Sequence, residues 1–285
     1  MYKFLILAMT VLTLFSACQR DNILTQDQWG PIFKKYGIDS ACFELADNNH
    51  DMIYIYNLQR ASKRFSPAST FKIINSLKSL ETNVALDENL IIPWDGVARR
   101  PEWDKDMNLR EAFKVSCVPY YQALARKIGK VDMQKWIDTV KYGNKRTGPN
   151  VDDFWLNDTL QITPDEQVGF IKKLYFDKLP FAQRSQRIVR SLMLQEDSTH
   201  YKLYYKTGTQ MPLRNNKKVI LAWIVGFVEK RETQIGVVTK KEETNYKPYF
   251  FAMNFETSDT TMNTMDIRKK LLKEILAERR IIIHD

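Results

Sequence analysis

A serine and a lysine stand three residues apart in Ser69-Thr70-Phe71-Lys72, a spacing that could supply a nucleophile and its base. A serine hydroxyl attacks well only when a base takes its proton. No histidine of this chain stands in a context that suits the role, so a lysine is the remaining candidate. Side chains three apart in a helix lie on the same face, so a helical segment would bring Ser69 and Lys72 together.

The surroundings of the pair favour this chemistry. Pro67 suits a helix start, which would place Ser69 in the first turn, where free amides and the helix dipole favour negative charge. A lysine has an ordinary pKa of about 10.4 and needs apolar surroundings to be neutral at pH 7. Phe65, Phe71 and Ile73 provide such surroundings. Because the same spacing also occurs at ordinary helix starts with a surface lysine, the pair needs support from other segments.

Two later segments add polar groups of the same kind. Ser116-Cys117-Val118 follows a short predicted helix, capped at Asn108, and offers a second hydroxyl. Lys206-Thr207-Gly208 lies on a predicted strand, Tyr204–Thr209, and adds a second lysine. Together these segments support Ser69 as the nucleophile and Lys72 as its base.

Other classes of function lack the residues that they need. The three histidines, His50, His200 and His284, are far apart, and no HExxH or paired Cys/His spacing is present, which argues against a zinc site. The glycine spacing after Gly143 resembles a phosphate-binding loop, but Pro149-Asn150 follows in place of Lys-Ser/Thr. The net charge is +9, yet the basic residues do not gather in one block. We therefore expect no metal, no nucleotide cofactor and no nucleic-acid partner, and small anionic substrates stay open.

The two ends of the chain are predicted to form strands, and the middle is predicted to be helical. A length of 285 residues with 44% hydrophobic and 27% charged residues suits one large domain or two interleaved ones. The predicted strands are Ala41–Ala46, Met52–Asn57, Tyr204–Thr209, Val219–Val228, Thr233–Thr239 and Tyr249–Phe255. The predicted helices begin at the capping box Thr163-Pro164-Asp165-Glu166, at Pro180 and near Met262, the last of them ending near Arg280. This order predicts an α+β fold: one antiparallel sheet from both chain ends with flanking helices, and an inserted all-helical lobe.

The first residues have the pattern of an export signal. The apolar stretch from Phe4 to Ala17 has 14 residues, fewer than the ~20 that cross a bilayer. Small residues before Cys18 resemble a bacterial lipoprotein signal, although Phe15 departs from that pattern. We expect residues 1–17 to be removed and Cys18 to be lipidated as the first mature residue, with simple cleavage as the alternative. The mature domain, residues 18–285, would then be periplasmic, and a lipid on Cys18 would attach it to a membrane.

Export makes disulfides possible for the two remaining cysteines, Cys42 and Cys117. Nothing in the sequence brings them within the ~6 Å between Cα atoms that a bridge needs. We therefore predict two buried free thiols.

The stretch from Arg64 to Lys72, RFSPASTFK, resembles the active-site segment of the class D (oxacillinase-type) β-lactamases. The other signatures of that family appear in the same order between about residues 40 and 276. They are Ser116-Cys117-Val118, Tyr142-Gly143-Asn144, Phe154-Trp155-Leu156, Lys206-Thr207-Gly208 and Trp223-Ile224-Val225-Gly226. The S-x-V and Y-G-N forms separate this pattern from class A enzymes. The chain is therefore identified as a member of class D.

The resemblance implies roles for the polar residues. Ser69 would attack the lactam carbonyl and form an acyl-enzyme. Lys72 would be the base as a carbamate, N-carboxylated by carbon dioxide, with the Trp155 indole N–H holding it. Ser116 would relay a proton to the lactam nitrogen, with electrostatic support from Lys206. No metal or other cofactor is implied.

Substrate binding follows from the same resemblance. The backbone N–H groups of Ser69 and Thr209 would form the oxyanion hole, although many relatives have an aromatic residue at the second position. Thr207 and Arg268 would contact the substrate carboxylate, and Val118 and Gly208 would line the pocket. Arg268 could also be an ordinary charge on a helix surface, and Tyr142-Gly143-Asn144 is expected to be structural.

The resemblance implies hydrolysis of β-lactam antibiotics, and thereby antibiotic resistance. Two related functions remain as alternatives: a β-lactam sensor that is acylated without turnover, and a cell-wall transpeptidase or carboxypeptidase. Sensor domains are preceded in their chains by several transmembrane helices. Transpeptidases are usually larger and carry S-x-N where this chain has S-x-V. The antibiotic spectrum and the oligomeric state stay open.

Overall fold

A computed structural model describes residues 22–235 and 242–283 of the chain. The proposed signal peptide, Cys18 and His284 lie outside the described residues. Export and lipidation therefore stay predictions, which incorporation of labelled palmitate would test. In the described part of the chain, no helix is long and apolar enough to cross a membrane.

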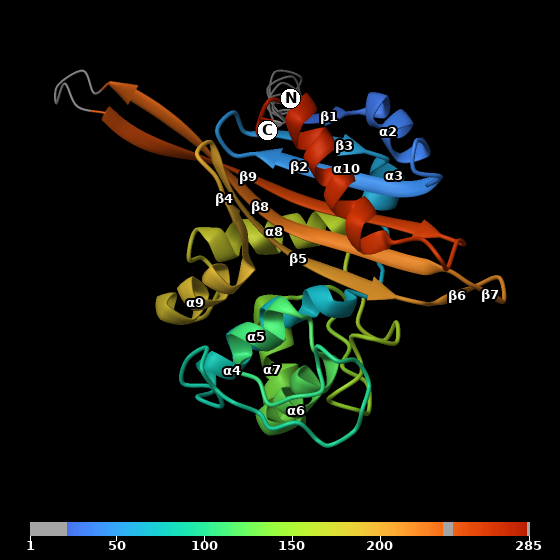
Figure 1. Cartoon of the computed structure of the whole chain (residues 1–285), viewed down its shortest axis with the longest axis vertical. Coiled ribbons are helices and arrows are strands. Elements are labelled where there is room, and N and C mark those ends of the chain that lie inside the picture. The colour runs from blue at the N-terminus through green and yellow to red at the C-terminus, as the bar shows by residue number, and fades with distance from the viewer. Residues whose placement is uncertain (1–21, 236–241, 284–285) are drawn as a thin grey trace, which may run out of the picture.

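A seven-stranded sheet forms the centre of the molecule, in the order β1-β3-β2-β9-β8-β5-β4 (Figure 1). Its strands are β1 (Ile23–Thr25), β2 (Ser40–Asp47), β3 (Met52–Tyr56), β4 (Leu194–Asp197), β5 (Tyr201–Gln210), β8 (Ile220–Ile235) and β9 (Glu242–Thr257). β1 pairs with β3 in parallel, and the other neighbours are antiparallel. A short hairpin of β6 (Leu213–Arg214) and β7 (Lys217–Lys218) stands apart from the sheet. Since both chain ends supply strands, the predicted α+β class is confirmed.

Helices cover both faces of this sheet. The helices are α2 (Gly30–Lys34), α3 (Leu58–Ala61), α4 (Lys72–Glu81), α5 (Leu109–Lys114), α6 (Val118–Ile128), α7 (Lys130–Val140), α8 (Pro164–Tyr175), α9 (Gln183–Met193) and α10 (Thr264–Glu278), with 3-10 turns η1 (Asp27–Trp29) and η2 (Ala68–Phe71). α10 and α2 pack on one face, and α8 packs on the other. α4 to α7 form the helical lobe beside β5 (Figure 1).

The alternation along β8 explains why both faces are covered. Leu221, Trp223 and Val225 belong to the core on the side of α8, whereas Ala222 and Ile224 belong to the core on the side of α10. Successive side chains of a strand point to opposite faces. A continuous apolar run is therefore what a strand buried on both sides requires.

One sequence prediction about the strands is wrong. The runs Val219–Val228 and Thr233–Thr239 were expected as two strands, but β8 continues through the charged residues between them and pairs with β9 as far as the described residues reach. Glu232 forms an ion pair across the strands with Lys247, whose Nζ lies 2.6 Å from the carboxylate. The charged run is thus the solvated part of a long hairpin rather than a turn (Figure 1).

Two predicted helix caps are confirmed, whereas the helix expected to begin at Pro180 begins three residues later, at Gln183. Asn108 and Glu111 form a capping box at the start of α5, and Thr163 and Glu166 form another at the start of α8. Both boxes satisfy amide groups that the first turn of a helix leaves free. These local signals place the ends of two helices that flank the polar segments.

Candidate active site

Ser69 lies in η2, directly before α4, and its hydroxyl accepts a hydrogen bond from Lys72 Nζ at 2.8 Å. Ala68, the residue before it, has a left-handed backbone with φ of +48°. The turn is held by Thr70, whose Oγ1 donates to the carbonyl of Pro67 at 2.7 Å and accepts from Gln167 Nε2 at 2.9 Å. The predicted pair is therefore in direct contact, on a turn fixed from both sides.

The Lys72 side chain is fully buried. Its Nζ lies 5.3 Å from the centre of the Tyr121 ring. Burial lowers the pKa of the Lys72 ammonium to about 7. A substantial share of this amine is therefore neutral near pH 7, which the predicted base and its carboxylation both require.

Trp155 is fully buried and stacks on Phe71, with ring centroids 5.1 Å apart. Its indole N–H has no hydrogen-bond acceptor within the described residues. A buried donor without a partner is rare and asks for an explanation. A carbamate oxygen on Lys72, the neighbour of Phe71 in the chain, is an acceptor of the kind that this donor lacks. The residues present thus fit a carboxylated lysine.

Ser116 and Lys206 form a second hydroxyl–lysine pair. Lys206 Nζ donates to Ser116 Oγ at 3.0 Å and to the carbonyl of Thr207 at 3.1 Å. Burial, together with the charges of Lys72 and Arg268, lowers the pKa of Lys206 well below its ordinary value. Ser116 itself has φ of +58°. The hydrogen bond between Lys206 and Ser116 can pass a proton to the serine hydroxyl.

β5 approaches the nucleophile at a glycine. A Cβ on Gly208 would lie 2.9 Å from the carbonyl oxygen of Pro67 and 3.2 Å from the backbone nitrogen of Ser69. Any larger residue would push β5 away from η2. Gly208 therefore keeps the backbone of β5, with Thr209 next in line, close to the Ser69 amide, as an oxyanion hole from these two residues requires.

Arg268 is buried rather than on a helix surface, with 2% of the residue exposed. Its Nη1 donates to the carbonyl of Gly208 at 2.7 Å, to Thr209 Oγ1 at 3.1 Å and to the carbonyl of Trp223 at 3.2 Å. Burial lowers the pKa of its guanidinium to about 10, so it remains charged at neutral pH. The arginine both fixes the end of β5 and brings a positive charge to the cleft.

A cavity of about 230 Å³ brings these groups together. Most of the predicted substrate contacts line it, namely Ser69, Ser116, Val118, Thr207, Gly208, Thr209 and Arg268. Lys72 and Trp155 are buried and do not line it, and Lys206 lines an adjoining cavity of about 300 Å³ beyond Ser116. The predicted residues thus surround one cleft between β5 and the helical lobe.

Sequence reasoning missed one side of the cleft. Arg100, Glu102 and Trp103 line the same cavity from the loop that precedes α5. This loop has no regular hydrophobic period. A tryptophan in a highly charged stretch was its only signal.

The Y-G-N segment has the structural role that was expected. Gly143 has φ of +53°, and a Cβ there would lie 2.1 Å from the carbonyl oxygen of Gln161. Asn144 Nδ2 donates to the carbonyl of Thr159 at 2.9 Å, and its Oδ1 accepts from the Gln161 amide at 3.1 Å. These bonds anchor the loop that carries Trp155.

The predicted free thiols are also confirmed. Cys42 and Cys117 are both buried and unbridged. Burial raises the pKa of the Cys42 thiol to about 12, so it is inert.

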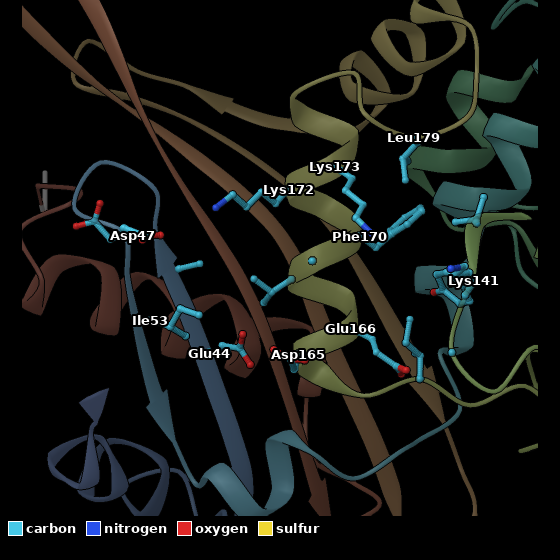
Figure 2. Close-up of a pocket in the computed structure, with 18 of the residues that line it drawn as sticks. Glu44, Asp47, Ile53, Lys141, Asp165, Glu166, Phe170, Lys172, Lys173 and Leu179 are labelled. Atoms are coloured by element: carbon cyan, nitrogen blue, oxygen red, sulfur yellow. The ribbon is translucent and has the colours of Figure 1, made fainter. Parts of the chain in front are cut away.

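A separate cavity of about 310 Å³ lies between the β2–β3 hairpin and α8 (Figure 2). Figure 2 shows Glu44 of β2 beside Asp165 of α8. Burial and the neighbouring Asp165 carboxylate raise the pKa of Glu44 to about 8, so Glu44 is protonated at neutral pH. None of the residues predicted to do chemistry lines this cavity.

Comparisons with known proteins agree with this geometry. Residues 41–277 match the family described as the penicillin binding protein transpeptidase domain. The chain is 38% identical to the probable β-lactamase YbxI of Bacillus subtilis, over 80% of this chain and 79% of the relative. It is also 38% identical to the β-lactamase OXA-48 of Klebsiella pneumoniae, over 84% of this chain and 83% of the relative.

Solved structures give the same result. The class D β-lactamase FUS-1 (OXA-85) of Fusobacterium nucleatum superposes with a TM-score of 0.79 at 34% identity, covering 91% of this chain and 100% of that one. A class D β-lactamase of Sebaldella termitidis superposes with a TM-score of 0.80 at 30% identity, covering 91% and 98%.

Proposed function

Since this chain belongs to the class D β-lactamases, which are hydrolases, we propose that it hydrolyses β-lactam antibiotics through an acyl-enzyme on Ser69, with N-carboxylated Lys72 as the general base. The observation that carries the proposal is the contact at 2.8 Å between Lys72 Nζ, on a fully buried side chain, and Ser69 Oγ, which faces the substrate cavity. Such an enzyme confers resistance on the cell that exports it.

Acylation uses the groups around the cleft. Ser69 Oγ bonds to the lactam carbonyl carbon while the base takes its proton, and the backbone amides of Ser69 and Thr209 stabilise the oxyanion. The carbon–nitrogen bond of the ring then breaks. Ser116 gives its proton to the ring nitrogen and recovers one through Lys206, to which it is hydrogen-bonded at 3.0 Å.

The base must also serve deacylation, when water attacks the ester. Carbon dioxide adds to a neutral lysine amine with loss of one proton, and the carbamate supplies an anionic oxygen that can accept a proton. The pKa of about 7 that burial gives Lys72 supports this chemistry near neutral pH. The unpaired Trp155 N–H supports it too, because a donor favours the charged carbamate.

The proposal predicts sustained turnover that depends on carbon dioxide. We expect steady-state hydrolysis of a chromogenic cephalosporin, which falls after acid treatment and degassing and recovers with bicarbonate. The Ser69→Ala variant should lose both turnover and covalent labelling by a fluorescent penicillin.

Three other results would change the proposal. A burst of one equivalent without turnover would favour a β-lactam sensor. Labelling that persists in Ser69→Ala at an active-site peptide would reject the nucleophile. Hydrolysis indifferent to bicarbonate, with no labelled carbon dioxide retained, would favour an uncarboxylated Lys72 amine as the base.

A further inference from the structure

Arg100 lies on the loop between Pro93 and Asp106 and lines the cavity that contains Ser69. The loop has its own internal bonds. Arg99 makes two hydrogen bonds of 2.8 Å to the Asp95 carboxylate, and its backbone amide donates to Asp104 at 3.0 Å. The carbonyl of Arg100 accepts bonds from the amides of the third and fourth residues after it, at 2.8 and 3.1 Å. The backbone of Arg100 is thus held at the mouth of the cleft.

The guanidinium of Arg100 stacks on Trp103, with Cζ 4.5 Å from the centre of the indole ring. Trp103 Nε1 donates to the carbonyl of Val115 at 3.0 Å, and Val115 directly precedes Ser116. The stack is therefore connected to the catalytic segment itself. A guanidinium on an aromatic face keeps its N–H groups free for an anion.

Little in the described chain neutralises this charge. Arg100 forms an ion pair with Glu102 at 4.0 Å, and both side chains are at least half exposed. A contact at the outer limit of ion-pair distance between exposed groups is weak. The catalytic cavity therefore contains a second guanidinium, that of Arg100, beside that of Arg268, with the Glu102 carboxylate only weakly paired to it.

A penicillin with a single carboxylate can pair with only one of the two guanidinium groups, that of Arg268 or that of Arg100. Thr207 and Arg268, at the β5–α10 side, are assigned to the carboxylate of the fused ring. The acyl side chain is attached to the ring on the other side of the lactam carbonyl. To meet the Arg100–Trp103 stack, it must lie along the part of the cavity that Arg100, Glu102 and Trp103 line. An anionic group on that side chain would meet the Arg100–Trp103 stack.

Resting on the proposed function, we propose that Arg100 is a specificity-determining residue that favours β-lactams with a second negative charge on the acyl side chain. Glu102 acts in the opposite sense, since it partly neutralises Arg100. Because the guanidinium is exposed and screened by salt, the preference amounts to about two- to fivefold in kcat/KM.

The test uses penicillins that differ at a single carbon. Benzylpenicillin, carbenicillin and ampicillin carry hydrogen, carboxylate and ammonium, respectively, on the α-carbon of the same phenylacetyl side chain. In Arg100→Gln, the ratio of kcat/KM for carbenicillin to kcat/KM for benzylpenicillin should fall about two- to fivefold. The ratio of kcat/KM for ampicillin to kcat/KM for benzylpenicillin should rise. In Glu102→Gln, the carbenicillin-to-benzylpenicillin ratio should rise and the ampicillin-to-benzylpenicillin ratio should fall.

Lys105→Gln is the matched control, because Lys105 lies on the same loop but does not line the catalytic cavity. It removes the same charge and should leave both ratios unchanged. Ratios that stay the same in Arg100→Gln, or that change equally in Lys105→Gln, would overturn the inference while hydrolysis of benzylpenicillin persists. Absence of any hydrolysis in the wild type would instead reject the proposed function.

Discussion

Helix α4 carries two buried lysines, Lys72 in its first turn and Lys78 in its second half. Both side chains are fully buried. Burial lowers the pKa of Lys72 to about 7 and that of Lys78 well below its ordinary value. By burial and charge alone, the two residues look alike.

Their partners differ. Lys72 Nζ donates to the hydroxyl of Ser69 at 2.8 Å, next to the substrate cavity. Lys78 Nζ donates to the carbonyl oxygen and the sulfur of Met133, both at 3.0 Å, inside the helical lobe. Neither acceptor has a proton to give up. A neutral buried amine thus becomes a base only where a hydroxyl and a substrate meet it, and a shifted pKa by itself does not identify the catalytic lysine.

The largest expected effect is on activity, and it separates the two lysines. Lys72→Ala should lower kcat by about 10²–10⁴-fold, the range for loss of a general base, and bicarbonate should not rescue it. Lys78→Met should keep kcat within about twofold, since the hydrogen bonds of its amine in the described chain go to Met133 and its contact with Phe71 is with the ring face, 5.5 Å from the ring centre. The measurement is cephalosporin hydrolysis by both folded variants, with circular dichroism as the check on folding. A Lys78→Met protein that is folded and inactive would contradict the comparison.

Most of the fold could be predicted because its signals are local. Capping boxes at Asn108 and Thr163 and the apolar runs of β2, β8 and β9 are visible in the sequence. The edge strands β1 and β4 were missed because they are short and mostly exposed, without alternation. The length of the β8–β9 hairpin was missed because its stability comes from pairs across the strands, such as Glu232 with Lys247, which no single run reveals.

The site residues could be predicted where the chemistry requires a fixed spacing in the sequence. They could not be placed where only the folded structure brings distant residues together. Ser69 and Lys72 are close in sequence and in space. Arg268 joins the site through the carbonyls of Gly208 and Trp223, which are distant in sequence, so its burial had no local signal. The burial of Lys78 was equally invisible, because its acceptor Met133 lies on another helix.

A smaller effect is expected at Trp155, and it concerns the carbamate on Lys72. Trp155→Phe keeps a ring to stack on Phe71 but removes the indole N–H, which is the buried unpaired donor. We expect the variant to acylate and then to deacylate about ten- to hundredfold more slowly, as for loss of a hydrogen bond to a charged group. Added bicarbonate should partly restore turnover.

Trp136→Phe is the control for this change, because Trp136 stacks on Phe181 in the helical lobe, away from the cleft. Its turnover should not respond to bicarbonate beyond the wild-type response. Slow deacylation in Trp155→Phe that bicarbonate leaves untouched would mean that the indole acts on the attacking water and not on the lysine.

The smallest expected effect is on the free energy of unfolding and its dependence on pH, and it concerns Lys78 alone. In the unfolded chain a lysine titrates near pH 10.4, whereas burial lowers the pKa of Lys78 in the folded protein. Between those two values the unfolded state binds more protons, so the free energy of unfolding rises with pH. The charge of Asp138 raises the pKa of Lys78 but does not offset the effect of burial.

Lys78→Met removes this contribution and leaves those of Lys72 and Lys206 in place. The variant should therefore be more stable than the wild type at pH 7, by an amount that shrinks toward pH 10. Per pH unit the difference should shrink by at most about 1.4 kcal/mol, the value for one proton. Urea unfolding at pH 7, 8 and 9 measures this difference in the free energy of unfolding. Lys127, an exposed lysine on a helix, supplies the control: Lys127→Met should not change how the free energy of unfolding depends on pH. A difference independent of pH would mean that Lys78 stays protonated in the folded protein, and the two lysines of α4 would then differ in charge as well as in partner.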